Sequence, residues 1–173
     1  MKKMKRFVAI LLAGVLALAM LTACGEEAVP SLGQRAENLM IDTFNKAYNT
    51  TYQNDADLKN QLNAILDKID ENGEIAASAL PKTKVSGLPG NVVDNKDGTG
   101  TFTIFVVAQG VNSDQSKYQA IEVTEEKLGS ADTSKIAGSF NMKPDAIGVA
   151  TVVKNGKTYI GVSYKMTLKA KFE

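Results

Sequence analysis

The 173-residue sequence contains no histidine, no tryptophan and only one cysteine. The absence of histidine excludes Ser-His and Cys-His nucleophile pairs, removes the commonest general base and argues against zinc sites of the usual kinds. No Ser-x-x-Lys sequence occurs, which excludes the acylating serine pattern of penicillin-binding enzymes. We therefore expect a protein that is not an enzyme and that binds no metal and no cofactor.

An excess of positive charge is also missing. The chain has 20 basic and 19 acidic residues, and four of the basic residues lie in the first six positions. Residues 24–173 therefore carry 16 basic and 19 acidic side chains, a net charge of −3. Nucleic-acid-binding domains show a basic patch or stripe, so we expect no nucleic acid partner.

The first 23 residues have the composition of a secretory signal peptide. A basic start without acids is followed by Phe7–Leu21, which contains no charge. As a helix, this apolar run is about 23 Å long, shorter than the ~30 Å hydrocarbon core of a bilayer. We predict a signal peptide at residues 1–23 rather than a membrane-spanning anchor.

The signal peptide ends in Leu21-Thr22-Ala23, directly before the only cysteine, Cys24. This sequence resembles the lipobox of bacterial lipoproteins. The resemblance implies that a dedicated signal peptidase recognises Leu21, Thr22 and Ala23, and that the thiol of Cys24 receives a diacylglyceryl group. Because two or more acyl chains give a stable anchor, the resemblance implies a protein held by its lipid at the extracytoplasmic face of a bacterial cell membrane.

Two alternatives stay open for the leader: a short uncleaved membrane anchor, or an ordinary cleaved signal in which the cysteine is incidental. All three interpretations place residues 25–173 outside the cytoplasm. Residues 24–30 form a short acidic tether ending in proline, and residues 31–173 are long enough for a single domain. With one cysteine in the chain, no disulfide within it stabilises this domain.

Two helices are expected at the start of the domain. Apolar residues at helical spacing predict one helix from Ser31 to about Tyr48. A second helix begins at a cap formed by Asn54 or Asp55, buries a stripe that reaches Ile69, and stops at Asn72-Gly73. A short helical piece is expected over Glu74–Leu80.

The remaining chain favours β-structure. Residues 81–100 are rich in turn residues, with a weak strand predicted near Val92. Two clearer strands are predicted at Thr101–Gln109 and Lys117–Val123. Asn155-Gly156 predicts a two-residue hairpin turn, so that opposed residue numbers sum to 311. We predict an α+β fold in which the two helices pack on an antiparallel sheet of four or five strands.

The C-terminal hairpin supplies the candidate binding surface. One of its faces is apolar, and the other pairs Gly148 with Ser163 and Ala150 with Gly161, a floor of small side chains that permits close approach by a helix or a ligand. The last strand then directs lysines to one side, for contact with an anionic envelope polymer or lipid headgroups, or for solubility. The candidate surface consists of Tyr159, Gly161, Ser163 and Lys165.

A calcium loop is excluded at "DNKDGTG". Placing Gly98 at the sixth position of an EF-hand puts Val93 first and Ile104 twelfth, where carboxylates are required.

The helix pair and the hairpin resemble the two ends of bacterial CAP (SCP) domains. The similar segments are "LMIDTFNKAYNTTYQNDADLKNQLNAILDKIDENG" and "KIAGSFNMKPDAIGVATVVKNGKTYIGVSYK". The family's cavity histidines and their partner glutamates have no matching positions, so the resemblance implies a divergent member without that chemistry. We expect a membrane-tethered binding or adaptor domain, with a structural or accessory subunit of an envelope complex as the alternative.

Overall fold

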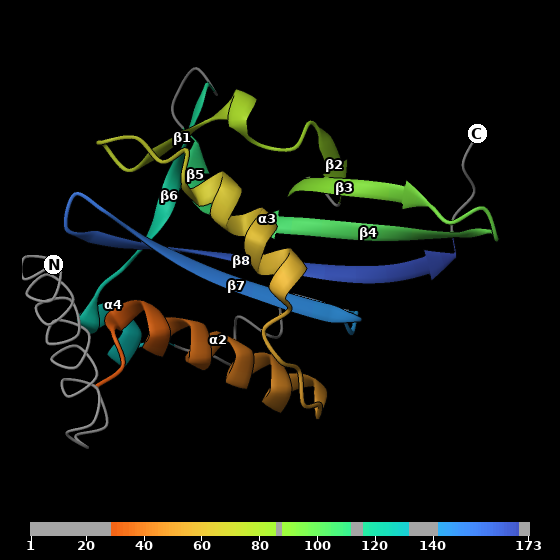
Figure 1. The fold of residues 1–173 in the computed structure, drawn as a ribbon, viewed down its shortest axis with the longest axis horizontal. Coiled ribbons are helices and arrows are strands. Elements are labelled where there is room, and N and C mark those ends of the chain that lie inside the picture. Colours follow the sequence, from red (N-terminus) through yellow and green to blue (C-terminus); the bar gives the residue numbers. More distant parts are fainter. Residues whose placement is uncertain (1–28, 86–87, 112–115, 132–141, 170–173) are drawn as a thin grey trace, which may run out of the picture.

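The computed structural model describes residues 29–85, 88–111, 116–131 and 142–169, which form three α-helices and one sheet of eight strands (Figure 1). The helices are α2 (Leu32–Tyr48), α3 (Ala56–Leu66) and α4 (Glu125–Gly129), and the strands are β1 (Glu74–Ala76), β2 (Thr83–Val85), β3 (Leu88–Asp94), β4 (Thr99–Val106), β5 (Ala108–Val111), β6 (Lys117–Val123), β7 (Ala146–Lys154) and β8 (Lys157–Lys169). The predicted α+β class is confirmed.

Helix α2 begins and ends where its sequence signals lie. The Ser31 hydroxyl accepts a hydrogen bond from the Gln34 amide at 3.2 Å, and the Gln34 side chain accepts one from the Ser31 amide at 2.8 Å. This reciprocal pair is a capping box, which satisfies two of the free donors at the helix start. Beyond Tyr48, Asn49 adopts a left-handed conformation with φ of 49° and terminates the helix.

Helix α3 is shorter than its apolar stripe predicts. Asp55 caps it by accepting from the Leu58 amide at 2.9 Å, but the helix ends at Leu66 and not near Asn72-Gly73. The cause is Asp70, whose carboxylate accepts from the amides of Asn72 and Glu74 and so stabilises a turn in place of further helix.

The expected helical piece at Glu74–Leu80 is also corrected. Glu74–Ala76 forms strand β1, which pairs antiparallel with Lys117–Gln119, and a single 3₁₀ turn follows at Ala77–Ala79. The sheet thus pairs these residues with a segment more than 40 positions away, and this pairing overrides the local preference.

Strand β8 is the centre of the sheet. β7 runs along one side of β8, while β4 and β6 pair with different halves of its other side. β3 and β2 follow β4, and β5 and β1 pair with β6. The sheet is larger than the four or five strands expected because β1, β2 and β5 have only three or four residues each, too few for a clear alternating pattern.

The β7–β8 hairpin has the predicted register. Asn155 and Gly156 have φ of 50° and 74°, as the favoured two-residue hairpin turn requires. Val153 lies opposite Thr158 and Ile147 lies opposite Tyr164, in agreement with the sum of 311.

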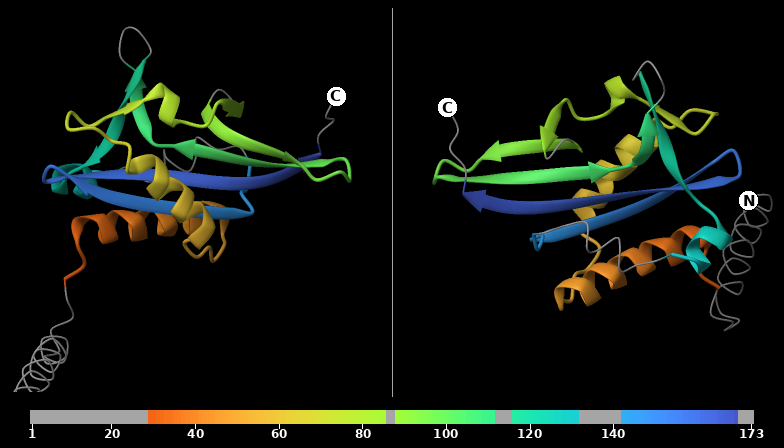
Figure 2. Two further views of the ribbon diagram at one scale, coloured as in Figure 1. Left: turned by 45° about the horizontal axis from the view of Figure 1, so that its top comes forward. Right: turned by 180° about the vertical axis from the view of Figure 1, so that it is seen from behind.

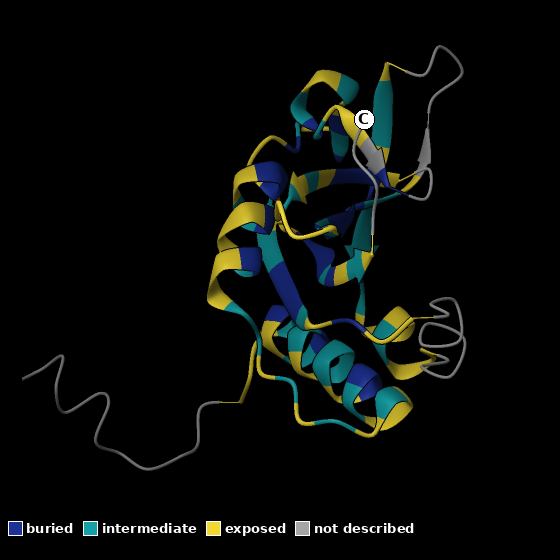
Figure 3. Cartoon of the chain, turned by 90° about the vertical axis from the view of Figure 1, so that its right-hand side faces the viewer, coloured by how far each residue is buried: buried dark blue, intermediate teal, exposed yellow. Residues whose placement is uncertain are grey.

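The two long helices cover opposite faces of this hairpin, and each face has its own apolar core (Figure 2). On the α2 side, Phe44 packs in a cluster with Ile147 and Val149; on the α3 side, Leu62 packs with Ala150. Figure 3 shows that each helix is buried on the side toward the sheet and exposed on the other. The hairpin is therefore the middle layer of a three-layer arrangement.

Helix α3 packs directly on the floor of small residues. A Cβ placed on Gly148 would lie 2.4 Å from the Cβ of Leu58, and one placed on Gly161 would lie 3.0 Å from a methyl group of Leu62. Of the two uses predicted for the floor, the structure shows the close-packed helix.

Candidate functional site

The residues of the lipobox, Leu21 to Cys24, lie outside the described residues. The described chain starts at Val29 and Pro30 and enters α2 at its Ser31 cap. The tether therefore joins the domain at the start of α2, near α4, at the left in Figure 1.

Three of the four residues predicted to form a binding surface are buried, which corrects that prediction. Tyr159 is 3% exposed and Ser163 is fully buried, and Gly161 lies under α3. The Tyr159 hydroxyl lies so close to Gly73 that a Cβ there would be 2.5 Å away. The reason is that α3 covers the half of the sheet that carries these three residues, so they pack inside the fold.

Lys165 lies on the same side of β8 but beyond the end of α3. Together with the neighbouring strands it forms a surface that we call the lysine–threonine face, in which Thr103 is buried and Lys165 and Thr101 are half-buried. Its members are Asn91 and Val93 of β3, Thr101 and Thr103 of β4, and Lys165, Thr167 and Lys169 of β8.

Strand register places these side chains in rows across the sheet. Asn91, Thr103 and Lys165 form one row, and Val93, Thr101 and Thr167 form the next. Val93 is 57% exposed, and Asn91, Thr167 and Lys169 are also exposed. None of the described helices lies in front of this part of the sheet (Figure 1).

Five lysines of the described domain are held by ion pairs, and the two lysines of this face are not among them. Ion pairs hold the side chains of Lys59, Lys96, Lys117, Lys154 and Lys157. Within the described residues, Lys165 and Lys169 form no ion pair; Lys169 is exposed and Lys165 is half-buried.

One carboxylate adjoins the lysine–threonine face. Thr99 lies opposite Lys169 in the register, and its hydroxyl and amide donate to Asp97 at 2.5 and 2.9 Å. These hydrogen bonds hold the pKa of Asp97 below its usual range, so this side chain stays negatively charged beside the face.

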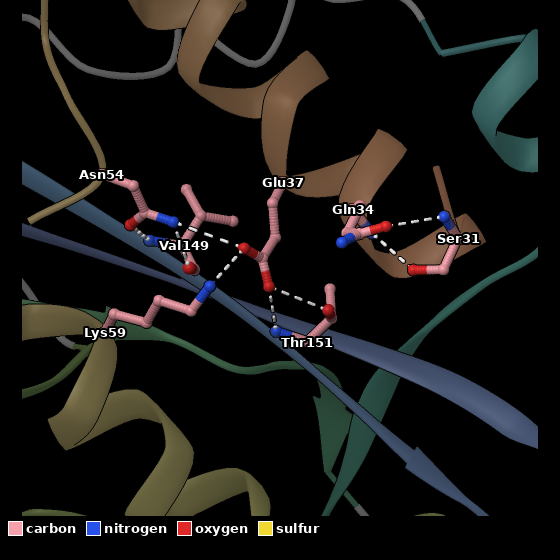
Figure 4. Close-up of polar contacts among 7 residues, drawn as sticks. All are labelled: Ser31, Gln34, Glu37, Asn54, Lys59, Val149 and Thr151. Carbon is pink, nitrogen blue, oxygen red and sulfur yellow. Dashed lines mark hydrogen bonds and ion pairs between the residues drawn. The ribbon is translucent and has the colours of Figure 1, made fainter. Parts of the chain in front are cut away.

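A second polar cluster lies at the free edge of β7 and was not predicted from the sequence (Figure 4). The Glu37 carboxylate accepts from the amide and hydroxyl of Thr151 at 3.0 and 2.9 Å, and from the Lys59 ammonium at 2.5 Å. The Asn54 side chain both donates to and accepts from the backbone of Val149, at 2.9 and 2.8 Å.

This Glu37 cluster ties α2, the α2–α3 loop and α3 to one strand. Asn54 and Glu37 satisfy backbone groups of β7 that a further strand would otherwise take, which protects the edge against pairing with another chain. Both carboxylate oxygens of Glu37 are used within the fold, so we interpret the cluster as structural. No local sequence signal identifies it, because its members come from separate elements.

We expect Glu37→Ala to destabilise the domain by about 1–3 kcal/mol, because it leaves the Thr151 amide without its acceptor and removes the partner of Lys59. The midpoint of urea unfolding measures the effect. Glu126→Ala is the matched control, since Glu126 is an exposed acid on α4. Equal midpoints for the two variants would contradict the structural role of Glu37.

Two hollows lie elsewhere on the described surface. An apolar one of about 150 Å³ lies between α2, β6 and α4, and it is lined by residues that include Leu39, Met40, Val123 and Leu128. A wider one of about 420 Å³, lined about equally by polar and apolar surface, lies between Thr50–Tyr52 and Lys143–Asp145. Burial raises the pKa of Tyr52 above its usual value, and the Tyr52 hydroxyl donates to the Pro144 carbonyl.

Among the described residues, no group of three or more Asp, Glu, Cys or His side chains is arranged to hold a metal ion. In the same part of the chain, no helix is both long and apolar enough to cross a membrane.

The fold and its surfaces thus define an α+β domain with an antiparallel sheet between two helices. No protein-family model, no curated protein and no solved structure matches this chain. The resemblance of its ends to CAP domains stays a prediction.

Proposed function

We propose that this chain is a bacterial lipoprotein, whose acylated Cys24 holds a non-catalytic binding or adaptor domain at the extracytoplasmic face of the cell membrane. The observation that carries the proposal is the order of the N-terminal signals: a basic start, an uncharged run of fifteen residues, and Leu21-Thr22-Ala23-Cys24. A folded domain that begins at a helix cap only seven residues after Cys24 agrees with this order.

The short tether limits how far the domain stands from the membrane. Seven residue steps span at most about 25 Å when fully extended. The start of α2 and the neighbouring α4 are then the end nearest to the bilayer, while the lysine–threonine face lies toward the opposite end (Figure 1).

A binding role agrees with the chemistry of the described surface. The lysine–threonine face offers unpaired cations and hydroxyl groups on a firm sheet, whereas the Glu37 cluster uses its polar atoms within the fold. The apolar hollow beside α4 favours a second candidate function, an accessory subunit that packs against another envelope protein. Isolation of partners from native membranes distinguishes the binding function from the accessory-subunit function. Leu128→Lys is the variant that blocks the hollow.

Intact mass measurement of the chain extracted from membranes tests the lipoprotein proposal. We expect a chain that begins at Cys24 and carries the added mass of acyl groups. Cys24→Ala is expected to lack the acyl mass and to remain unprocessed or to leave the membrane fraction. Val29→Ala, whose side chain is 87% exposed between the lipobox and the domain, serves as the control and keeps the wild-type mass pattern. A membrane-bound chain that keeps residues 1–23 and has no acyl group would overturn the proposal.

A further inference from the structure

We propose that the lysine–threonine face binds a linear, phosphate-bearing polyanion. The proposal names the ligand class of the binding domain, and it rests on the proposed function for where such a polymer is met. Four observations carry it: the charge of the face, the spacing of its cations, its hydroxyl groups and its position relative to the tether.

The face carries a positive charge that no ion pair within the described residues neutralises. Lys165 and Lys169 have no ion-pair partner within the described residues, and the other five members of the face, Asn91, Val93, Thr101, Thr103 and Thr167, are uncharged. Unpaired cations on one face attract anions at long range, although the domain as a whole carries no basic excess.

The spacing favours a polymer over a small anion. Lys165 and Lys169 are four residues apart on one strand, which places their Cα atoms about 13 Å apart. A free phosphate meets both ammonium groups only when the two side chains bend toward each other, whereas a chain with repeated phosphates places a separate anion at each extended lysine.

The hydroxyl groups supply the remaining contacts. Thr167 lies between the two lysines along β8, and Thr101 lies beside Thr167 in the register. Hydroxyls both donate to phosphate oxygens and accept from hydroxyl groups of a polymer backbone. The exposed side chain of Val93 in the same row provides an apolar contact for carbon atoms of that backbone.

The position of the face distinguishes a polymer from the headgroups of the anchoring membrane. Helix α2 is 17 residues long, about 25 Å, and the tether enters at its first residue. The face lies toward the far end of the sheet from the point where the tether enters, so an orientation with α4 and the start of α2 toward the bilayer leaves the face free to meet a polymer (Figure 1).

Binding of fluorescent long-chain polyphosphate to the full chain in neutral detergent, measured by anisotropy, tests the proposal. We expect saturable binding that weakens as salt is added. Inorganic phosphate at the same phosphorus concentration is expected not to compete. The double variant Lys165→Gln/Lys169→Gln is expected to bind at least about tenfold more weakly, because the removed charges carry most of the salt-dependent attraction.

Two further variants make the test specific. Lys46→Gln/Lys68→Gln removes the same charge from exposed lysines that lie on α2 and after α3, and we expect it to bind within about twofold of the wild type. Asp97→Asn removes the carboxylate beside the face and is expected to tighten binding. The proposal is overturned if both lysine pairs weaken binding equally, or if the polymer does not bind.

Binding to vesicles distinguishes a phosphate-bearing polymer from the phosphate headgroups of a membrane. Binding of the unacylated Cys24→Ala chain to anionic vesicles through Lys165 and Lys169, without binding to polyphosphate, would overturn the polymer in favour of headgroups. The result of this binding test does not depend on whether intact mass measurement finds acyl groups at Cys24. Polymer binding by a chain without acyl groups would keep the ligand class and remove only the proposed anchor.

Discussion

Gly148→Val is expected to destabilise the domain by about 3 kcal/mol, because the new side chain has no room beneath α3. The Cβ alone would lie 2.4 Å from the Leu58 Cβ and 2.9 Å from backbone atoms of Leu58 and Lys59. Two of these are backbone atoms, and the position of the Leu58 Cβ is fixed by the backbone, so a change of side-chain rotamer does not relieve the clash. The helix must move away from β7, and the core on that face must open.

Chemical denaturation of Gly148→Val and of a matched control measures this effect. Gly129→Val is the control, since a Cβ at Gly129 meets no atom within 4 Å. The control is expected to stay within about 1 kcal/mol of the wild type. Unfolding of both variants at the same denaturant concentration would contradict the close packing of α3 on the hairpin.

Phe44→Ala is expected to cost about 3–5 kcal/mol on the opposite face of the sheet. Phe44 is 1% exposed, and its ring lies 6.2 Å from that of Tyr48 and 6.3 Å from that of Tyr164. Removing the ring leaves a cavity between α2 and β8 that neither tyrosine fills without leaving its own contacts.

Thermal unfolding monitored by circular dichroism is the measurement for Phe44→Ala. For a domain of about 150 residues, this loss corresponds to a fall in Tm of roughly 10 °C or more. Val153→Ala shortens a side chain that is 66% exposed and is expected to leave Tm nearly unchanged. A fall of less than about 3 °C for Phe44→Ala would contradict the packing described for α2.

Local sequence signals predict those parts of the fold that local interactions decide. The hairpin follows from Asn155-Gly156, because the turn type fixes the register of both strands. The start of α2 follows from its cap. The end of α3 also has a local signal, the turn that Asp70 stabilises, but the apolar stripe that reaches Ile69 conceals it. In contrast, strand β1 depends on pairing with β6 and cannot be predicted from the residues nearby.

For the candidate surface too, local signals predict one part and contacts between distant residues decide the rest. Alternation along β8 correctly places Tyr159, Gly161, Ser163 and Lys165 on one side of the strand. It does not show that α3 covers only part of that side. With 11 residues, α3 is about 16 Å long, so it buries Ser163 and leaves Lys165 beyond it. The Glu37 cluster was missed because it joins residues more than 110 positions apart.

The order of the layers has a consequence for biogenesis. The two helices at the beginning of the chain pack on opposite faces of a hairpin made from its last strands. While the ribosome is still adding residues before the hairpin, neither helix has its main packing partner. Folding therefore waits until the hairpin has been synthesised, and long-range contacts of this kind form slowly. We expect the newly made polypeptide to stay unfolded until that point, a state that the proposed export through a narrow channel would require.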